Sequence, residues 1–250
     1  MTREASYYLC QGQPDPPSLD LLTSVFAQVN RLTQLDARLA LQQGFGVLAE
    51  RLPREEADGL CRRLEQAYYP AAVVAEEELA LPRATPLSRA GVGDDAFSIY
   101  DFYGRAHPID WKDLLVLHAG SYPRGQIATT RRAGFAVVCG HVYSWDAVRE
   151  YVETDEIVLE LVFASPPRRF AIRPTPFNYG DLGPRRVHDS SANFAILLGD
   201  LLRHYPRPVH NLGLHLSGDP SEISAMTRYP GRRLFERHLM WLSWYASLSR

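Results

Sequence analysis

The apolar pattern of residues 6–76 changes its period five times, and each change coincides with residues that end or begin a regular element. SYYLC at 6–10 alternates as a strand does, and the prolines of QGQPDPP end it. After Ser18, a favoured N-cap residue, apolar residues recur three and four apart and predict a helix. The remaining predicted elements are a short helix ending at Gly44, a strand over 45–52, a helix from Pro53 and a strand over 71–76. The predicted order is therefore strand, helix, helix, strand, helix, strand.

The last helix and strand of this series, PREEADGLCRRLEQAYYPAAVV, have an acidic beginning, leucines at 60 and 64 and a closing pair of valines. With the order of elements, this unit makes residues 1–76 resemble the C-terminal domain of the ribosomal stalk protein and its ferredoxin-like bacterial relatives. The resemblance implies a small β-α-α-β-α-β domain. In the stalk family one helix face docks translation factors through lysines. Residues 1–76 contain no lysine, so the resemblance does not carry factor binding over to this chain.

Composition and charge change after residue 76. The segment EEELALPRATPLSRAGVGDD mixes charges, prolines and glycines without an apolar period. Residues 1–95 carry a net charge of −5 and residues 96–250 a net charge of +3, an asymmetry that suggests two domains. We therefore predict a first domain over 1–76, a linker over 77–95 and a second domain over 96–250.

Residues 96–250 are rich in segments with strand character. AFSIYDFYG and RAHPIDW are predicted to meet at a tight turn at Gly104, and DLLVLHAG, RAGFAVVCGHVY, EIVLELVFA and RRFAIRP are further strand-like segments. SSANFAILLGDLLRHYP predicts an amphipathic helix capped by Ser190 or Ser191. Strands followed by one such helix favour a small barrel or sandwich that the helix plugs.

The segments IYDFYGRAHPIDWKDLLVLHAG and RRFAIRPTPFNYGDLG, with the helix after them, resemble a bacterial pleckstrin-homology-like domain. The predicted fold class is therefore α+β, with the small domain followed by a pleckstrin-homology-like β-barrel or sandwich and C-terminal helices. Relatives that bind phosphoinositides place several basic residues at the first hairpin. Here that hairpin offers Arg105 with Lys112 nearby, which is too little positive charge to predict lipid binding.

The motifs that carry catalysis or cofactor binding are absent from the sequence. It contains neither the GxSxG elbow of serine hydrolases nor the phosphate loops GxxxxGK[ST] and GxGxxG, and its histidines lack metal-ligand spacing such as HExxH. Cys10, Cys61 and Cys139 lack a CxxC spacing and lie in apolar runs, which predicts buried reduced thiols. We therefore predict no enzymatic activity, no cofactor and no metal.

Four arginines are the first candidate site. Arg168 and Arg169 precede a predicted strand, and Arg185 and Arg186 follow the loop after it. Guanidinium groups suit phosphate and carboxylate because their donors form a planar fork. These residues predict a small-anion site, and the alternative is that they are solvated or structural arginines.

The C-terminal segment GRRLFERHLMWLSWYASLSR is the second candidate, because it predicts a helix that is apolar around most of its circumference. Met240, Trp241 and Trp244 are its candidate protein-interaction residues. Such a helix needs cover. Packing against both domains of its own chain is one interpretation, and a dimer seam, a partner groove or a membrane-surface anchor are the others.

The overall charge and the lack of a long apolar stretch limit the classes of partner that we expect. A balance of 27 basic against 29 acidic residues argues against nucleic acid, and no apolar stretch reaches the ~18 to 20 residues of a membrane span. We expect a cytoplasmic bacterial interaction or regulatory adaptor that binds a protein partner or a second copy through the C-terminal helix, without peripheral membrane contact. The alternative is an enzyme or small-anion sensor with a site between the domains, formed by residues such as His118, His141 and Arg186.

Overall fold

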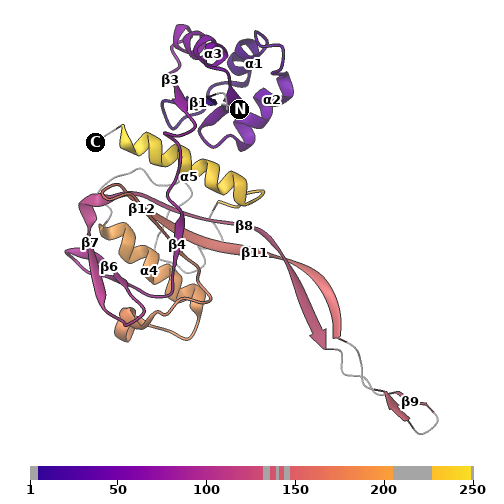
Figure 1. The fold of residues 1–250 in the computed structure, drawn as a ribbon, viewed down its shortest axis with the longest axis vertical. Coiled ribbons are helices and arrows are strands. Elements are labelled where there is room, and N and C mark those ends of the chain that lie inside the picture. Colours follow the sequence, from indigo (N-terminus) through magenta and orange to yellow (C-terminus); the bar gives the residue numbers. More distant parts are fainter. Residues whose placement is uncertain (1–4, 132–135, 139–140, 144–146, 205–226, 249–250) are drawn as a thin grey trace.

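The computed structural model describes residues 5–131, 136–138, 141–143, 147–204 and 227–248, and within 126–153 it describes the backbone alone. The predicted mixed α+β class is confirmed. Figure 1 shows a small N-terminal unit, a larger sheet with a long projecting strand pair, and helix α5 (Arg232–Ser247) between the unit and the sheet.

The N-terminal unit is a three-stranded antiparallel sheet, in the order β2-β1-β3, with three helices on one face. Side chains alternate across β1, so Leu9 packs with the helices while Tyr8 and Cys10 pack on the opposite face, under α5. The elements are β1 (Tyr7–Gln11), α1 (Leu19–Phe26), α2 (Gln34–Gln43), β2 (Val47–Leu52), α3 (Arg54–Gln66) and β3 (Ala71–Ala75).

Local capping explains where these helices begin. The Ser18 hydroxyl accepts a hydrogen bond from the first turn of α1, as its position in the sequence predicts. Thr33 and Asp36 form a capping box at the start of α2, in which each side chain accepts a hydrogen bond from the other residue's backbone N–H. After α2, Phe45 and Gly46 have positive φ angles of 47° and 89° and turn the chain into β2.

The larger sheet has four strands in the order β4-β12-β11-β8, and β4 is its parallel edge strand. A three-stranded antiparallel sheet, β5-β6-β7, shares a core with it. The strands are β4 (Ala84–Leu87), β5 (Ala90–Val92), β6 (Ala96–Tyr100), β7 (Ala106–Asp110), β8 (Leu114–Arg131), β11 (Ala147–Phe163) and β12 (Arg168–Ile172). A further pair is β9 (Ala136–Val138) with β10 (His141–Tyr143), and the 3-10 helices are η1 (Trp111–Asp113) and η2 (Gly180–Arg185).

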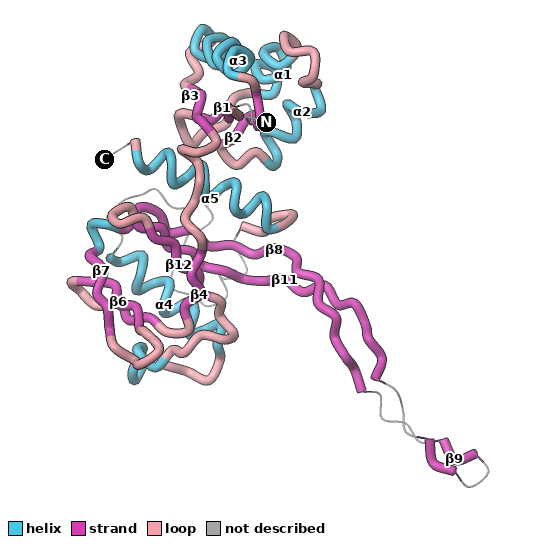
Figure 2. Tube along the Cα trace, in the orientation of Figure 1, coloured by secondary structure: helices cyan, strands magenta, loops and turns pink. Residues whose placement is uncertain are grey.

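Different helices cover the two faces of the larger sheet. On β8, Leu117 and Ala119 pack in the core that contains α4 (Ser190–His204), whereas Val116 packs with α5. Period-two alternation therefore places His118 and Gly120 on the α5 face. Helix α5 lies between this face and the N-terminal sheet, and its Leu239 and Leu242 share one core with both (Figure 2).

Strands β8 and β11 are much longer than the segments that predict them. Their pairing runs from Leu114 with Phe163 to Arg131 with Ala147, whereas β12 accompanies β11 only over Leu159–Phe163. Beyond the body of the sheet the two strands form a ribbon that projects from it (Figure 2). In the described part of the chain, the distal ribbon, residues 126–131 with 147–152, pairs only within itself.

The predicted barrel is wrong. The larger sheet ends at β4 on one side and at β8 on the other, and these two strands are not hydrogen-bonded to each other. Closure is not needed to cover the apolar faces, because α4 covers one of them and α5 covers the other. The sequence predicts a barrel or sandwich that a helix plugs. The structure has an open four-stranded sheet that α4 and α5 cover on opposite faces, and the sheet β5-β6-β7 shares the core on the α4 side.

Residues 77–95 are not the linker that their composition predicts. β4 completes the edge of the larger sheet, and β5 pairs with β6. Leu79 and Ala90 are each 2% exposed. Strands of four and three residues are too short to show an apolar period, and β4 pairs with a strand far along the chain. The division into domains at 1–76 and 96–250 stays a prediction.

Candidate functional site

Polar side chains lie at the centre of the sheet face that α5 covers. His118 on β8 is opposite Glu160 on β11, and Arg169 extends from β12 on the same face, beside Val162. All three are buried, and His118 is 0% exposed. A buried polar group destabilises the fold unless it is hydrogen-bonded, so the partners of these side chains decide what the cluster does.

A hydrogen-bond chain connects His118 to α5. The Tyr229 hydroxyl lies 2.8 Å from His118 Nε2 and 2.7 Å from His238 Nδ1, and these two ring nitrogens are 3.4 Å apart. Phe45 stacks on His238 with ring centres 5.2 Å apart, and Phe235 lies against His118 at 4.4 Å. The three polar groups are therefore enclosed by aromatic rings from the N-terminal unit and from α5.

The two imidazoles of this hydrogen-bond chain, His118 and His238, are neutral at pH 7. Burial, helped by the nearby His238 and Arg169, holds the pKa of His118 well below its ordinary value. Burial also lowers the pKa of His238 to about 4. The two imidazoles and the Tyr229 hydroxyl are therefore joined by hydrogen bonds between neutral groups.

A buried ion pair lies next to the chain. The Glu160 carboxylate accepts a hydrogen bond from Arg169 Nε, and Glu236 of α5 lies 3.6 Å from Arg169 Nη2. Burial raises the pKa of Glu160, and Arg169 opposes the rise. Two buried atoms here have no hydrogen-bond partner, namely His118 Nδ1 and Arg169 Nη2. His118 Nδ1 is a ring nitrogen whose protonation no hydrogen bond fixes, and Arg169 Nη2 is a hydrogen-bond donor.

A groove of about 260 Å³ opens beside His238, between the N-terminal unit and α5. The Trp241 indole forms one wall and donates a hydrogen bond from Nε1 to the Gln11 carbonyl oxygen at 2.9 Å. Gly46 allows this ring to lie against the backbone, because a Cβ there would be 1.9 Å from Trp241 Cδ2. The groove is also lined by Pro14, Pro16, Ala40, Leu41, Gln42, Phe45 and Thr227.

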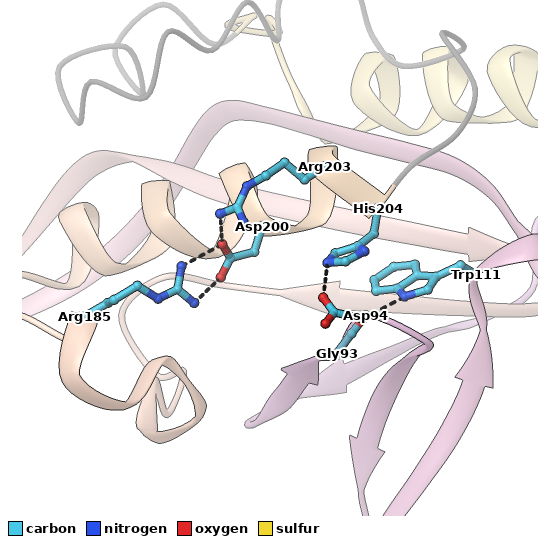
Figure 3. A network of polar contacts seen from close by, with 7 residues as sticks. All are labelled: Gly93, Asp94, Trp111, Arg185, Asp200, Arg203 and His204. Atoms are coloured by element: carbon cyan, nitrogen blue, oxygen red, sulfur yellow. Dashed lines mark hydrogen bonds and ion pairs between the residues drawn. The ribbon is translucent and has the colours of Figure 1, made fainter.

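A second polar network lies on the other face of the sheet (Figure 3). Asp200 of α4 accepts two hydrogen bonds from Arg185, at 2.8 and 2.6 Å, and pairs with Arg203. Burial alone would raise the pKa of Asp200, but the two guanidinium groups outweigh it and the pKa is lowered. His204 stacks on Trp111, with ring centres 5.2 Å apart. The cavity beside Asp200 is only about 10 Å³, room for no more than one water, and the Arg185–Asp200 pair links η2 to α4.

The predicted anion site is wrong, because its arginines do not converge. Arg169 lies on the α5 face with Glu160, whereas Arg185 lies on the α4 side with Asp200. Arg168 and Arg186 are exposed. The interpretation of structural and solvated arginines therefore holds, because two of the four neutralise buried carboxylates on opposite faces of one sheet.

The C-terminal helix packs within its own chain. Trp241 is 4% exposed and is therefore not available to a partner, contrary to the prediction. Met240 and Trp244 are partly buried against the same core. The apolar circumference is explained by two sheets that cover the helix from opposite sides, which is the interpretation that α5 packs against its own chain.

A prominent exposed feature was not singled out from the sequence. Phe102 is 98% exposed and Tyr103 is 80% exposed, side by side in the turn between β6 and β7. The Asp101 carboxylate accepts hydrogen bonds from the backbone N–H groups of Tyr103 and Arg105, both at 2.9 Å. Gly104, with φ of 76°, completes the turn. The sequence feature that indicates this exposed pair is two adjacent aromatic residues at the centre of a predicted turn, where side chains point to solvent.

The other candidates have plain outcomes. Cys10 and Cys61 are buried free thiols, and burial raises their pKa values to about 12 and about 11, so neither is a ready nucleophile. Cys139 and the His141 side chain lie outside the described residues. Within the described ranges, no group of three or more His, Cys, Asp or Glu is placed to hold a metal ion. In that same part of the chain, no helix has the length and apolar character to cross a membrane.

Comparisons with protein-family models, with curated proteins and with solved structures find no match to this chain.

Proposed function

We propose that this protein is a non-enzymatic interaction protein that binds a protein partner through the turn between β6 and β7. The observation that carries the proposal is the pair Phe102 and Tyr103, two adjacent and highly exposed aromatic side chains. Large exposed apolar groups that adjoin one another are typical of interaction sites. Asp101 holds the turn through two backbone hydrogen bonds, so little conformational freedom is lost when the aromatics enter a pocket.

The charges around the turn favour a protein over a membrane. Arg105 and Lys112 are accompanied by three carboxylates, of Asp101, Asp110 and Asp113. Lys112 Nζ lies 2.7 Å from Asp110, which neutralises it. Binding to an anionic lipid surface relies on an excess of positive charge, and this turn has none. A partner with an apolar pocket matches the turn better.

The strand ribbon of β8 and β11 supports the same class of function. Among the described residues its distal part pairs only within itself, so no described strand is bonded to its two outer backbone edges. Free strand edges are a recurrent means of pairing with another chain.

Site-specific photo-crosslinking tests the proposal. Phe102 is replaced by benzoylphenylalanine in the full chain, and Tyr68, 97% exposed on the N-terminal unit, is replaced in a matched control. After illumination in the native cell, position 102 is expected to give a discrete protein adduct that position 68 does not give. Tyr103→Ser is expected to reduce the adduct without changing stability, because an exposed side chain contributes little to folding. Identical adduct patterns at 102 and 68 would contradict the proposal.

The alternative is an enzyme or small-ligand sensor with a site between the N-terminal unit and the larger sheet. One observation favours it, namely the groove beside His238, which the N-terminal unit, Thr227 and α5 line. Of the residues predicted for such a site, His118 is connected to this groove by hydrogen bonds through Tyr229 to His238. Arg186, in contrast, is exposed at the end of η2.

A further inference from the structure

Strand β3 is an edge strand of the N-terminal sheet (Figure 1). Among the described strands its one neighbour is β1. The Gly12 N–H donates a hydrogen bond to the Pro70 carbonyl oxygen at 2.9 Å, and the Glu76 N–H donates one to the Ser6 carbonyl oxygen at 3.0 Å. The even-numbered residues from 70 to 76 therefore bond to β1. Because a strand turns the backbone groups of successive residues to opposite sides, Val73 presents both its N–H and its C=O to the outer side.

A groove of about 560 Å³ lies between this outer side and helix α3. The strand contributes Ala71 and Val73 to its lining, and the helix contributes Asp58, Cys61, Arg62 and Glu65. The Cys61 thiol lies 3.4 Å from the Ala71 carbonyl oxygen, which confirms that odd-numbered carbonyls of β3 point towards α3. In the described part of the chain, no other strand or turn is bonded to the outer side of Val73. A strand edge beside a helix is an arrangement to which an extended peptide adds as a further strand.

The charges in the groove favour a basic peptide. Asp58 and Glu65 are seven residues apart, so their Cα atoms lie about 10 Å apart along the axis of α3, on one side of the helix. Arg62 lies between them and donates from Nε to the Asp58 carbonyl oxygen at 3.2 Å. Arg54 pairs with the Asp58 carboxylate at 3.3 Å, in an exposed pair that contributes little. Residues 1–95 carry a net charge of −5, which adds to the attraction for a cation.

The spacing of the two carboxylates matches an extended chain. Residues four apart on a strand point to the same face and are about 13 Å apart, so two lysines at this spacing reach both Asp58 and Glu65. The residue midway between them points to the same face, towards Cys61. A second copy of β3 fits less well, because its sequence AAVVA has no basic residue and is followed by three glutamates.

We propose that β3 and α3 bind an extended peptide segment of a partner protein, in which an apolar residue lies midway between two lysines or arginines. The peptide adds a fourth strand to the N-terminal sheet by hydrogen bonds to the Val73 N–H and C=O. Its apolar side chain packs over Cys61, and its basic side chains pair with Asp58 and Glu65. This site is separate from the turn that contains Phe102, so it does not depend on the function proposed above.

The test uses the full chain and a fluorescein-labelled peptide with blocked ends, Lys-Thr-Val-Thr-Lys, with binding followed by fluorescence anisotropy. Val73→Pro removes the outward N–H but no hydrogen bond to β1, a position at which an edge strand tolerates proline. It is expected to weaken binding at least about fivefold, the loss that one hydrogen bond entails. Val73→Ala also shortens the side chain but keeps the N–H, and as the matched control it is expected to bind as the wild type does. The peptide Glu-Thr-Val-Thr-Glu is expected to bind at least about threefold more weakly than the lysine peptide.

A measurement on the wild type keeps the proposal testable if Val73→Pro does not fold. With ¹⁵N-labelled valine, the lysine peptide is expected to move the Val73 amide proton downfield and saturably, because that N–H gains an acceptor. The Val74 N–H already bonds to β1 and is the internal control, so its resonance is expected to move less.

Four results would overturn the proposal. The first is an absence of saturable binding, and the second is equal affinity in wild type and a folded Val73→Pro variant. The third is a glutamate peptide that binds as tightly as the lysine peptide, or a Val74 amide that moves as far as that of Val73. The fourth is a dimer in light scattering that Val73→Pro dissociates, which would make a second copy the occupant of this edge. None of these results bears on the crosslinking expected from Phe102.

Discussion

Acid should destabilise this protein through His238. Its pKa is about 4 in the folded chain against an ordinary value of 6.5, so between these values the unfolded chain binds more protons. The stability from keeping the ring neutral is complete above pH 6.5 and is lost as the pH falls towards 4. Between pH 7 and pH 5, linkage gives a loss of about 2 kcal/mol in the free energy of unfolding from this group. His118 acts in the same direction, because its pKa is also lowered.

Urea unfolding at pH 7, 6 and 5, followed by circular dichroism, measures this loss. The quantity to compare is the fall in unfolding free energy between pH 7 and pH 5, in the wild type and in His238→Phe. Glu160, whose raised pKa acts in the opposite sense, is present in both proteins, so its contribution cancels in the difference. The wild type is expected to lose about 2 kcal/mol more than the variant. An equal loss in both proteins would refute the assignment of a lowered pKa to His238.

Two further substitutions test the packing. Gly46→Ala places a Cβ 1.9 Å from Trp241 Cδ2 at a residue with positive φ, so urea unfolding should show a loss of about 3 kcal/mol or more. Gly104→Ala, also at positive φ but in open space, should lose only about 1 kcal/mol, and equal losses would contradict the steric argument. Asp200→Asn removes the charge of a buried carboxylate that pairs with Arg185 and Arg203. It should lose about 1.5 kcal/mol in the same assay, because the two guanidinium groups left unpaired are 51% and 68% exposed and solvent stabilises them. Asp58→Asn, in an exposed pair, should change stability by less than about 1 kcal/mol, and an Asp200→Asn variant as stable as this control would refute the role of Asp200.

One residue of the candidate site, His118, could be predicted from the sequence. His118 was a candidate for a site between the domains, and it does lie where α5 joins the larger sheet to the N-terminal unit. Its partners could not be predicted, because Tyr229 and His238 are 111 and 120 residues away and neither carries a motif. His238 belongs to the apolar stripe of a predicted helix, where a histidine is usually a packing residue. The burial that lowers its pKa depends on the two units that enclose it.

The sequence by itself determined that helices α1 and α5 form. Ser18 caps α1 as predicted, and the apolar stripe of the C-terminal segment becomes α5, because capping and helical periodicity act between residues only a few positions apart. Only the tertiary structure decided what α5 covers. A helix that is apolar around most of its circumference must be buried, but its pattern does not state by what. Here the N-terminal sheet and the β8–β11 face bury it from opposite sides, and that packing encloses Trp241, separates Arg169 from Arg185 and forms the groove beside His238.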